Sequence, residues 1–220
     1  MPLSSQTPSH LRSQIHALKA GLKSPDLPFG VDLLIPAVGK TPRGSEARKT
    51  NYDYTKGGLM DLIAVIIEEK TSLFVCAVGV PPPEAVKALH DARIVIMNMI
   101  GLPKHAKYAI EAGADILCAQ GSEAGGHSQT VVPTALLVPK CIEIAKGHKS
   151  PLTGEPIMVL AAGGIHDGKG LASALIMGAA GVWVGTRFVA SKEASAPEYV
   201  PPWVVNPPQR LRFPLLDAGI

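Results

Sequence analysis

The chain has 220 residues, of which 46% are hydrophobic and 18% charged, and this composition excludes a largely disordered protein. The formal net charge is only +3, and the basic residues are scattered, so we expect no nucleic-acid partner. The three cysteines, Cys76, Cys118 and Cys141, form no CxxC pair, which indicates reduced thiols and favours a cytoplasmic location. The longest apolar stretch, residues 174–185, carries three glycines and is too short to span a membrane.

Apolar runs alternate with segments of helical period along the chain. The runs predict six strands, at residues 31–36, 73–80, 94–99, 115–119, 157–162 and 181–184. The helical segments are residues 59–67, 83–89, 104–112, 133–146 and 169–177. Strands that are almost continuous apolar runs are buried on both faces, so we expect an α/β fold with a parallel sheet covered by helices. The regular spacing of the strands favours a TIM (β/α)8 barrel, although a complete barrel has eight strands.

Two segments depart from this alternation. Residues 39–58 are polar and follow a strand, so they form either an active-site loop or an ordinary surface insertion. Residues 196–220 hold six prolines and no clear period, which predicts an extended or disordered tail. We therefore expect one partial barrel domain over residues 1–195.

Three of the predicted strands end in glycine-rich sequence. Residues 119–127 read AQGSEAGGH, residues 159–165 read VLAAGGI and residues 181–186 read GVWVGT. Glycines allow backbone amides to approach a ligand closely, and the last two loops of a barrel commonly bind phosphate. The pattern predicts a phosphate-bearing cofactor, with tight turns alone as the alternative. His127 is a candidate general base or a histidine held by a backbone carbonyl, and no metal site is predicted because no ligand spacing fits one.

These motifs resemble the nitronate monooxygenase family, formerly called 2-nitropropane dioxygenases. The segments AQGSEAGGH, AAGGIHDGKGLASAL and GVWVGTRFVASKEA carry the resemblance, and LFVCAVGVPPPEAV with IVIMNMIGLPKHA is similar to the fungal-type branch. The resemblance implies an FMN-dependent TIM barrel that uses O₂ to oxidise alkyl nitronates or nitroalkanes to carbonyl compounds and nitrite. A flavin-dependent enoyl-acyl-carrier-protein reductase shares the AGGH and AGGI elements and stays open as an alternative. A truncated remnant that binds flavin weakly, without catalysis, is a third possibility.

The resemblance also assigns roles to individual residues. It makes His127 the base that removes the α-proton of a neutral nitroalkane. Contacts with the flavin or its phosphate would come from Gln120, Gly125, Gly126, Gly163, Gly164, Trp183, Val184, Gly185 and Thr186. Asn98 and Met99, at the end of an earlier strand, are expected to face the flavin or the substrate.

The resemblance covers residues 9–196, whereas full members begin with two further strands that contribute flavin contacts. We therefore expect an incomplete barrel of about six strands, without the first two. Such a barrel has two open parallel edges, so the chain is either a fragment or a protein that self-associates through those edges.

Overall fold

The computed structural model describes residues 7–24, 26–35, 53–125, 130–189 and 191. The sheet is formed by β1 (Gly30–Ile35), β2 (Leu73–Val78), β3 (Val95–Ile100), β4 (Ile116–Gln120), β5 (Met158–Ala162) and β6 (Gly181–Trp183). The helices are α1 (Pro8–Gly21), α2 (Leu59–Glu68), α3 (Pro83–Asp91), α4 (Pro103–Ala112), α5 (Thr134–Ala145), α6 (Gly168–Ile176) and α7 (Thr186–Val189). All six predicted strands and all five predicted helices are therefore confirmed, with each end within two residues of the predicted one.

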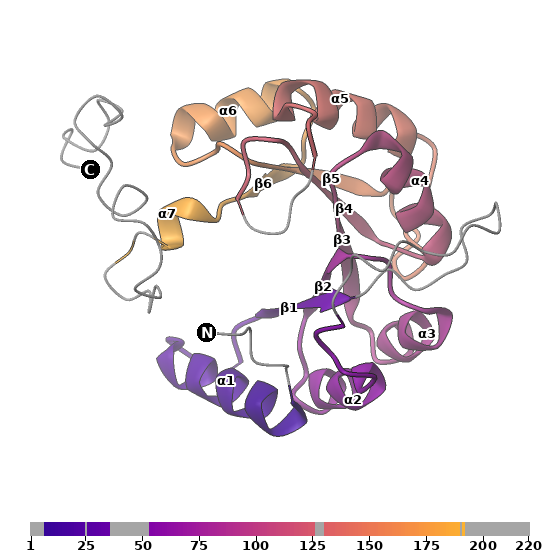
Figure 1. Ribbon diagram of the computed structural model, residues 1–220, viewed down its shortest axis with the longest axis vertical. Coiled ribbons are helices and arrows are strands. Elements are labelled where there is room, and N and C mark those ends of the chain that lie inside the picture. The colour runs from indigo at the N-terminus through magenta and orange to yellow at the C-terminus, as the bar shows by residue number, and fades with distance from the viewer. Residues whose placement is uncertain (1–6, 25, 36–52, 126–129, 190, 192–220) are drawn as a thin grey trace.

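The six strands pair in chain order, and every pair is parallel. Figure 1 shows a curved sheet with helices α1 to α6 on its outer side. Among the described strands, β1 pairs only with β2, and β6 pairs only with β5. The expected α/β fold is confirmed as an open arc of a barrel. Residues 196–220 and most of the polar 39–58 segment lie outside the described residues.

The helix ends follow from local chemistry. Pro83 and Pro103 begin α3 and α4, where a missing amide proton costs nothing. Gly113 ends α4 in the left-handed conformation with φ 101°, as a glycine at this position allows. Asp167 caps α6, because its side chain accepts a hydrogen bond from the Gly170 amide at 2.9 Å. These signals are readable in the sequence, which explains why the predicted boundaries are close.

The sheet separates two layers of packed side chains. One side faces the helices, where Phe74 and Cys76 of β2 are buried. Alternate residues of each strand point to the opposite side, which we call the concave face. It carries a packed apolar cluster, made up of Leu73, Val75, Met97, Met99, Ile116, Cys118, Leu160, Ala162 and Trp183. The three cysteines are free and buried, as expected.

A buried carboxylate holds the amino-terminal side of the sheet together. Asp115, just before β4, accepts hydrogen bonds from His90 Nε2 at 3.0 Å and from the Ile96 amide at 2.8 Å. Ser150 Oγ and the Leu152 amide donate to its other oxygen. Asp115 therefore links α3, β3 and the segment before β5, away from the loops at the carboxyl ends of the strands.

A second carboxylate joins α1 to α2. Glu69 accepts hydrogen bonds from Arg12 Nη1 at 2.9 Å, His16 Nε2 at 3.0 Å and Lys19 Nζ at 2.6 Å. Its side chain is 9% exposed. The hydrogen bond from Lys19, followed by that from His16, lowers the pKa of Glu69 to about 2, against the opposing effect of burial. The cluster fixes α1 on the outer helix layer.

Candidate active site at the carboxyl ends of the strands

Side chains tie neighbouring loops together where the strands end. The Asn98 side-chain amide donates to the Gly79 carbonyl at 3.3 Å, joining β3 to the loop after β2. Thr130 Oγ1 donates to the Gly101 carbonyl, joining the loop after β4 to the loop after β3. Because the carboxyl ends of parallel strands lie at one edge, these bonds preorganise a single rim of loops.

The closest connection joins the loops after β4 and β5. The Glu123 carboxylate accepts hydrogen bonds from the Thr134 amide, at 2.9 and 3.1 Å, and from Thr134 Oγ1 at 2.9 Å. The same hydroxyl lies 3.2 Å from the carbonyl oxygens of Ala162 and Gly163. The Gly121 amide also donates to the Ala162 carbonyl at 2.9 Å. We call Glu123 and Thr134 the loop clasp, since they hold the motif after β4 against the motif after β5.

Glu123 is ionised in this clasp. Burial tends to raise the pKa of Glu123, but the hydrogen bonds from Thr134 outweigh that effect and hold the pKa below its ordinary value. Thr134 is the first residue of α5, so the carboxylate also caps the start of that helix.

Packing explains three of the glycines in these motifs. A Cβ on Gly121 would lie 2.2 Å from Thr134 Oγ1, and one on Gly163 would lie 2.9 Å from the same atom. A Cβ on Gly164 would lie 3.1 Å from Glu123 Cβ. Gly163 and Gly164 also have φ values of 102° and 71°, which favour glycine. Close loop packing therefore accounts for these glycines even without a ligand.

Gly125 and Gly185 differ from them. No described atom lies within 4 Å of a Cβ built on either residue, and both are exposed. The described packing therefore gives no reason for glycine at these two positions. The Gln120 side chain donates to the Gly125 carbonyl at 3.3 Å and is expected on the concave face from its register beside Ala162.

The remaining predicted site residues are distributed as follows. Met99 and Trp183 both belong to the concave-face cluster, and Val184 is half-buried just after β6. Asn98 lies on the opposite face from Met99, where Cys76 Sγ donates to its oxygen at 3.1 Å. Thr186 begins α7. Gly126 and His127 lie outside the described residues.

The end of β6 is tied to the loop after β5. Arg187 Nη1 donates to the His166 carbonyl at 3.1 Å. The structure thus brings together the three glycine-rich motifs along one rim, as their positions after consecutive strands predicted. Thr134 was missed by sequence reasoning, because it is the first residue inside α5 rather than its N-cap, Pro133, and its hydroxyl donates to a carboxylate eleven residues earlier.

A second missed residue is Asp32 in β1. It pairs in register with Val75, whereas its neighbours Val31 and Leu33 are buried against the helices. Asp32 therefore faces the concave side. Burial raises its pKa to about 6, although its side chain is exposed to solvent, as expected for a carboxyl group in a concave surface. The signal in the sequence was one acidic residue within an apolar run.

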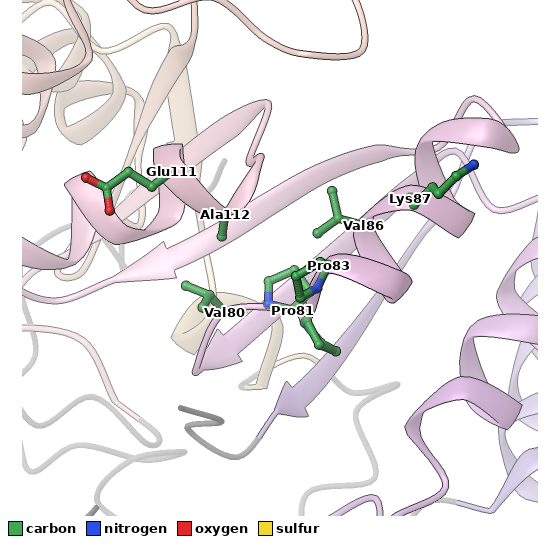
Figure 2. Close-up of a pocket in the computed structure, with 8 residues that line it drawn as sticks. Val80, Pro81, Pro83, Val86, Lys87, Glu111 and Ala112 are labelled. Carbon is green, nitrogen blue, oxygen red and sulfur yellow. The ribbon is translucent and has the colours of Figure 1, made fainter. Parts of the chain in front are cut away.

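A separate pocket lies on the outer helix layer, between α3 and α4 (Figure 2). It is lined by Val80, Pro81, Pro82, Pro83, Val86, Lys87, Glu111 and Ala112. None of these residues was predicted to belong to the site.

Within the described part of the chain, no helix is long and apolar enough to cross a membrane. The described residues also contain no group of three or more His, Cys, Asp or Glu side chains placed to hold a metal ion.

Known proteins share this sequence and fold. The chain is 42% identical over 120 residues to a 5-hydroxy-7a-methyl-1-oxo-octahydro-1H-indene-4-carboxyl-CoA dehydrogenase of Rhodococcus jostii, covering 54% of this chain and 31% of that protein. It is 39% identical over 117 residues to a nitronate monooxygenase of Neurospora crassa, covering 53% and 30%. The structure of FabK from Thermotoga maritima matches with a TM-score of 0.62 and 29% identity, over 86% of this chain and 50% of that one.

The chain spans less than half the length of the curated relatives that it matches. The family match itself is more extensive, because it covers residues 3–209 and includes all three glycine-rich motifs. The chain therefore belongs to the nitronate monooxygenase family.

Proposed function

We propose that this protein is an FMN-dependent enzyme that uses O₂ to oxidise alkyl nitronates to carbonyl compounds and nitrite. The observation that carries the proposal is the loop clasp, which packs two family motifs directly against each other at the carboxyl ends of β4 and β5. Loops at these strand ends are where barrel enzymes bind phosphate groups and substrates.

The residues present fit a flavin mononucleotide. No described atom lies within 4 Å of a Cβ built on Gly125 or Gly185, which supports a close approach of a phosphate to the backbone there. Met99 and Trp183 contribute apolar surface on the concave face, and Gln120 adds an amide beside it. When bound, FMN supplies the redox chemistry with the substrate and O₂, while the protein supplies position, a proton acceptor and exclusion of water.

His127 is the proposed proton acceptor. A neutral nitroalkane must lose its α-proton before oxidation, and an imidazole has a suitable pKa for this step near neutral pH. A substrate supplied as the nitronate has already lost that proton. The base is therefore needed for one substrate form and not for the other.

This difference gives the test. We expect FMN-loaded His127→Ala to lose at least about 100-fold in turnover of 2-nitropropane, the scale of general-base catalysis. It should keep turnover of propyl-2-nitronate within about tenfold of the native protein. His148→Ala, which changes an exposed histidine before β5, is the control and should leave both rates unchanged. Equal losses on both substrates would show that His127 is not the base.

A second candidate function is oxidation or reduction of a thioester substrate, and the 42% identity to the CoA-ester dehydrogenase favours it. Anaerobic titration separates the candidates. Bleaching of the flavin spectrum by propyl-2-nitronate supports nitronate oxidation. Bleaching by NAD(P)H, with consumption in the presence of an enoyl thioester, supports the alternative. A protein that stays colourless after addition of FMN would be the non-catalytic remnant.

Two further expectations belong to this proposal. The free, buried cysteines support a cytoplasmic location.

The edge strands of the described sheet, β1 and β6, have one paired neighbour each, which supports self-association through those edges. Sedimentation equilibrium of the purified protein tests the second expectation, and a monomer at all concentrations would contradict it.

A further inference from the structure

The concave face carries one carboxyl group among the described strand residues, that of Asp32. The apolar cluster covers most of this face, and Gln120 is its other strongly polar side chain on a described strand. Asp32 reaches this face because β1 alternates, placing Val31, Leu33 and Ile35 in the core beneath the helices. The carboxyl group therefore stands beside the surface on which the ligand is proposed to lie.

Asp32 differs from the structural carboxylates of this protein. Glu69 and Asp115 each accept hydrogen bonds from three or more groups. Asp32 has no hydrogen-bond or ion-pair partner among the described residues. An unpaired carboxyl group in a partly desolvated position does not stabilise the fold. Such a group, placed in a concave surface, is instead typical of a functional site.

The electrostatic neighbours of Asp32 show how the face curves. Burial, and then the charge of Asp32, raises the pKa of Cys118 to about 12. Cys118 lies on β4, three strands away from β1, and its side chain is on the concave face with Asp32. Burial followed by the same charge also raises the pKa of Cys76 on β2. The described strand residues facing Asp32 include no Lys, Arg or His that would neutralise it.

We propose that Asp32 contacts the substrate on the concave face. Its protonated form favours the binding of an anionic ligand, and the anion is an alkyl nitronate. This inference rests on the proposed function for the identity of the anion. The neutral acid donates a hydrogen bond to a nitronate oxygen. The carboxylate cannot donate, and it repels the negative charge in a partly desolvated environment. Binding of the nitronate should therefore weaken as the pH rises through about 6.

The test compares KM for propyl-2-nitronate in FMN-loaded native protein and Asp32→Asn between about pH 5 and pH 8. The ratio of the two KM values cancels the ionisation of the substrate and of His127, because both proteins share them. We expect a native-to-variant ratio near 1 at about pH 5 that rises to about tenfold or more at pH 8. The asparagine keeps the size and a hydrogen-bond donor, so kcat should change by less than about threefold.

Asp91→Asn is the matched control, since it makes the same change at an exposed carboxyl group of α3, away from the concave face. Its KM should follow the native pH dependence. A flat native-to-variant ratio for Asp32→Asn in an active enzyme would overturn the role of Asp32. Absence of nitronate oxidation by both proteins would instead overturn the proposed function and, with it, the nitronate as ligand.

Thermal melting without ligand provides a readout that does not depend on activity. The pKa of Asp32 is raised in the folded protein from 3.8 to about 6, so stability is lost as the pH rises from about 4 to about 6, and the loss is complete above that range. Asp32→Asn should therefore melt at a higher temperature than the native protein at pH 8, and at the same temperature at about pH 4. An equal melting temperature at pH 8 would show a fully solvated carboxyl group and contradict the inference.

Discussion

Thr134→Val tests the loop clasp with an almost isosteric change. Thr134 is 6% exposed, so valine fits the same space and removes only the hydroxyl group. The hydroxyl donates to Glu123 at 2.9 Å and lies near the Gly163 carbonyl. A hydrogen bond to a charged group contributes about 1.5–3 kcal/mol. The Ala162 carbonyl keeps its bond from Gly121, so we expect a total loss of about 2–3 kcal/mol in the free energy of unfolding.

Urea unfolding followed by circular dichroism measures this loss. Thr134→Ser is the control, because serine keeps the hydroxyl and loses only a methyl group, at a cost of about 1 kcal/mol or less. A double-mutant cycle with Glu123→Gln should give a coupling energy of at least about 1 kcal/mol. The reasoning is refuted if Thr134→Val unfolds within about 0.5 kcal/mol of the native protein, or if serine is as harmful as valine.

Two further predictions concern the carboxylates that hold the helices. Asp115→Ala removes the acceptor shared by His90 and Ser150 and leaves buried donors unpaired. Urea unfolding should therefore show a loss of about 3–5 kcal/mol in the free energy of unfolding. A loss below about 1 kcal/mol would contradict this role. The lowered pKa of Glu69, about 2, adds stability that is present above the unfolded-state pKa of about 4.5 and is lost as the pH falls towards 2. Native protein should therefore lose more stability between pH 7 and pH 3 than Glu69→Gln, and parallel losses would show that the bonds from Lys19 do not form in solution.

The sequence alone determined the order and type of the elements. Strands buried on both faces are long apolar runs, and proline or glycine marks the helix ends, so both features are visible locally. The sequence also placed the three glycine-rich motifs after consecutive strands. In a parallel sheet this order suffices to bring them to one rim.

Only the tertiary structure shows why glycine is needed at particular positions of the glycine-rich motifs. Gly163 and Gly164 looked equivalent to Gly125 and Gly185 in the sequence. In the structure the first two pack against the loop after β4, whereas the other two have no described atom within 4 Å of a Cβ built on them. The distinction depends on which loop lies next to which, and local sequence carries no record of such long-range neighbours.

The faces of the strands were likewise decided by the fold. An apolar run with hydrophobic side chains on both faces has no alternation, so the sequence could not tell that Met99 lies on the concave face and Asn98 on the helix side. Asp32 was overlooked for the same reason. Its importance comes from the curvature of the sheet, which places it across from Cys118 on a strand more than 80 residues away in the chain. Such proximity follows from packing the strands into an arc, and periodicity along the chain does not encode it.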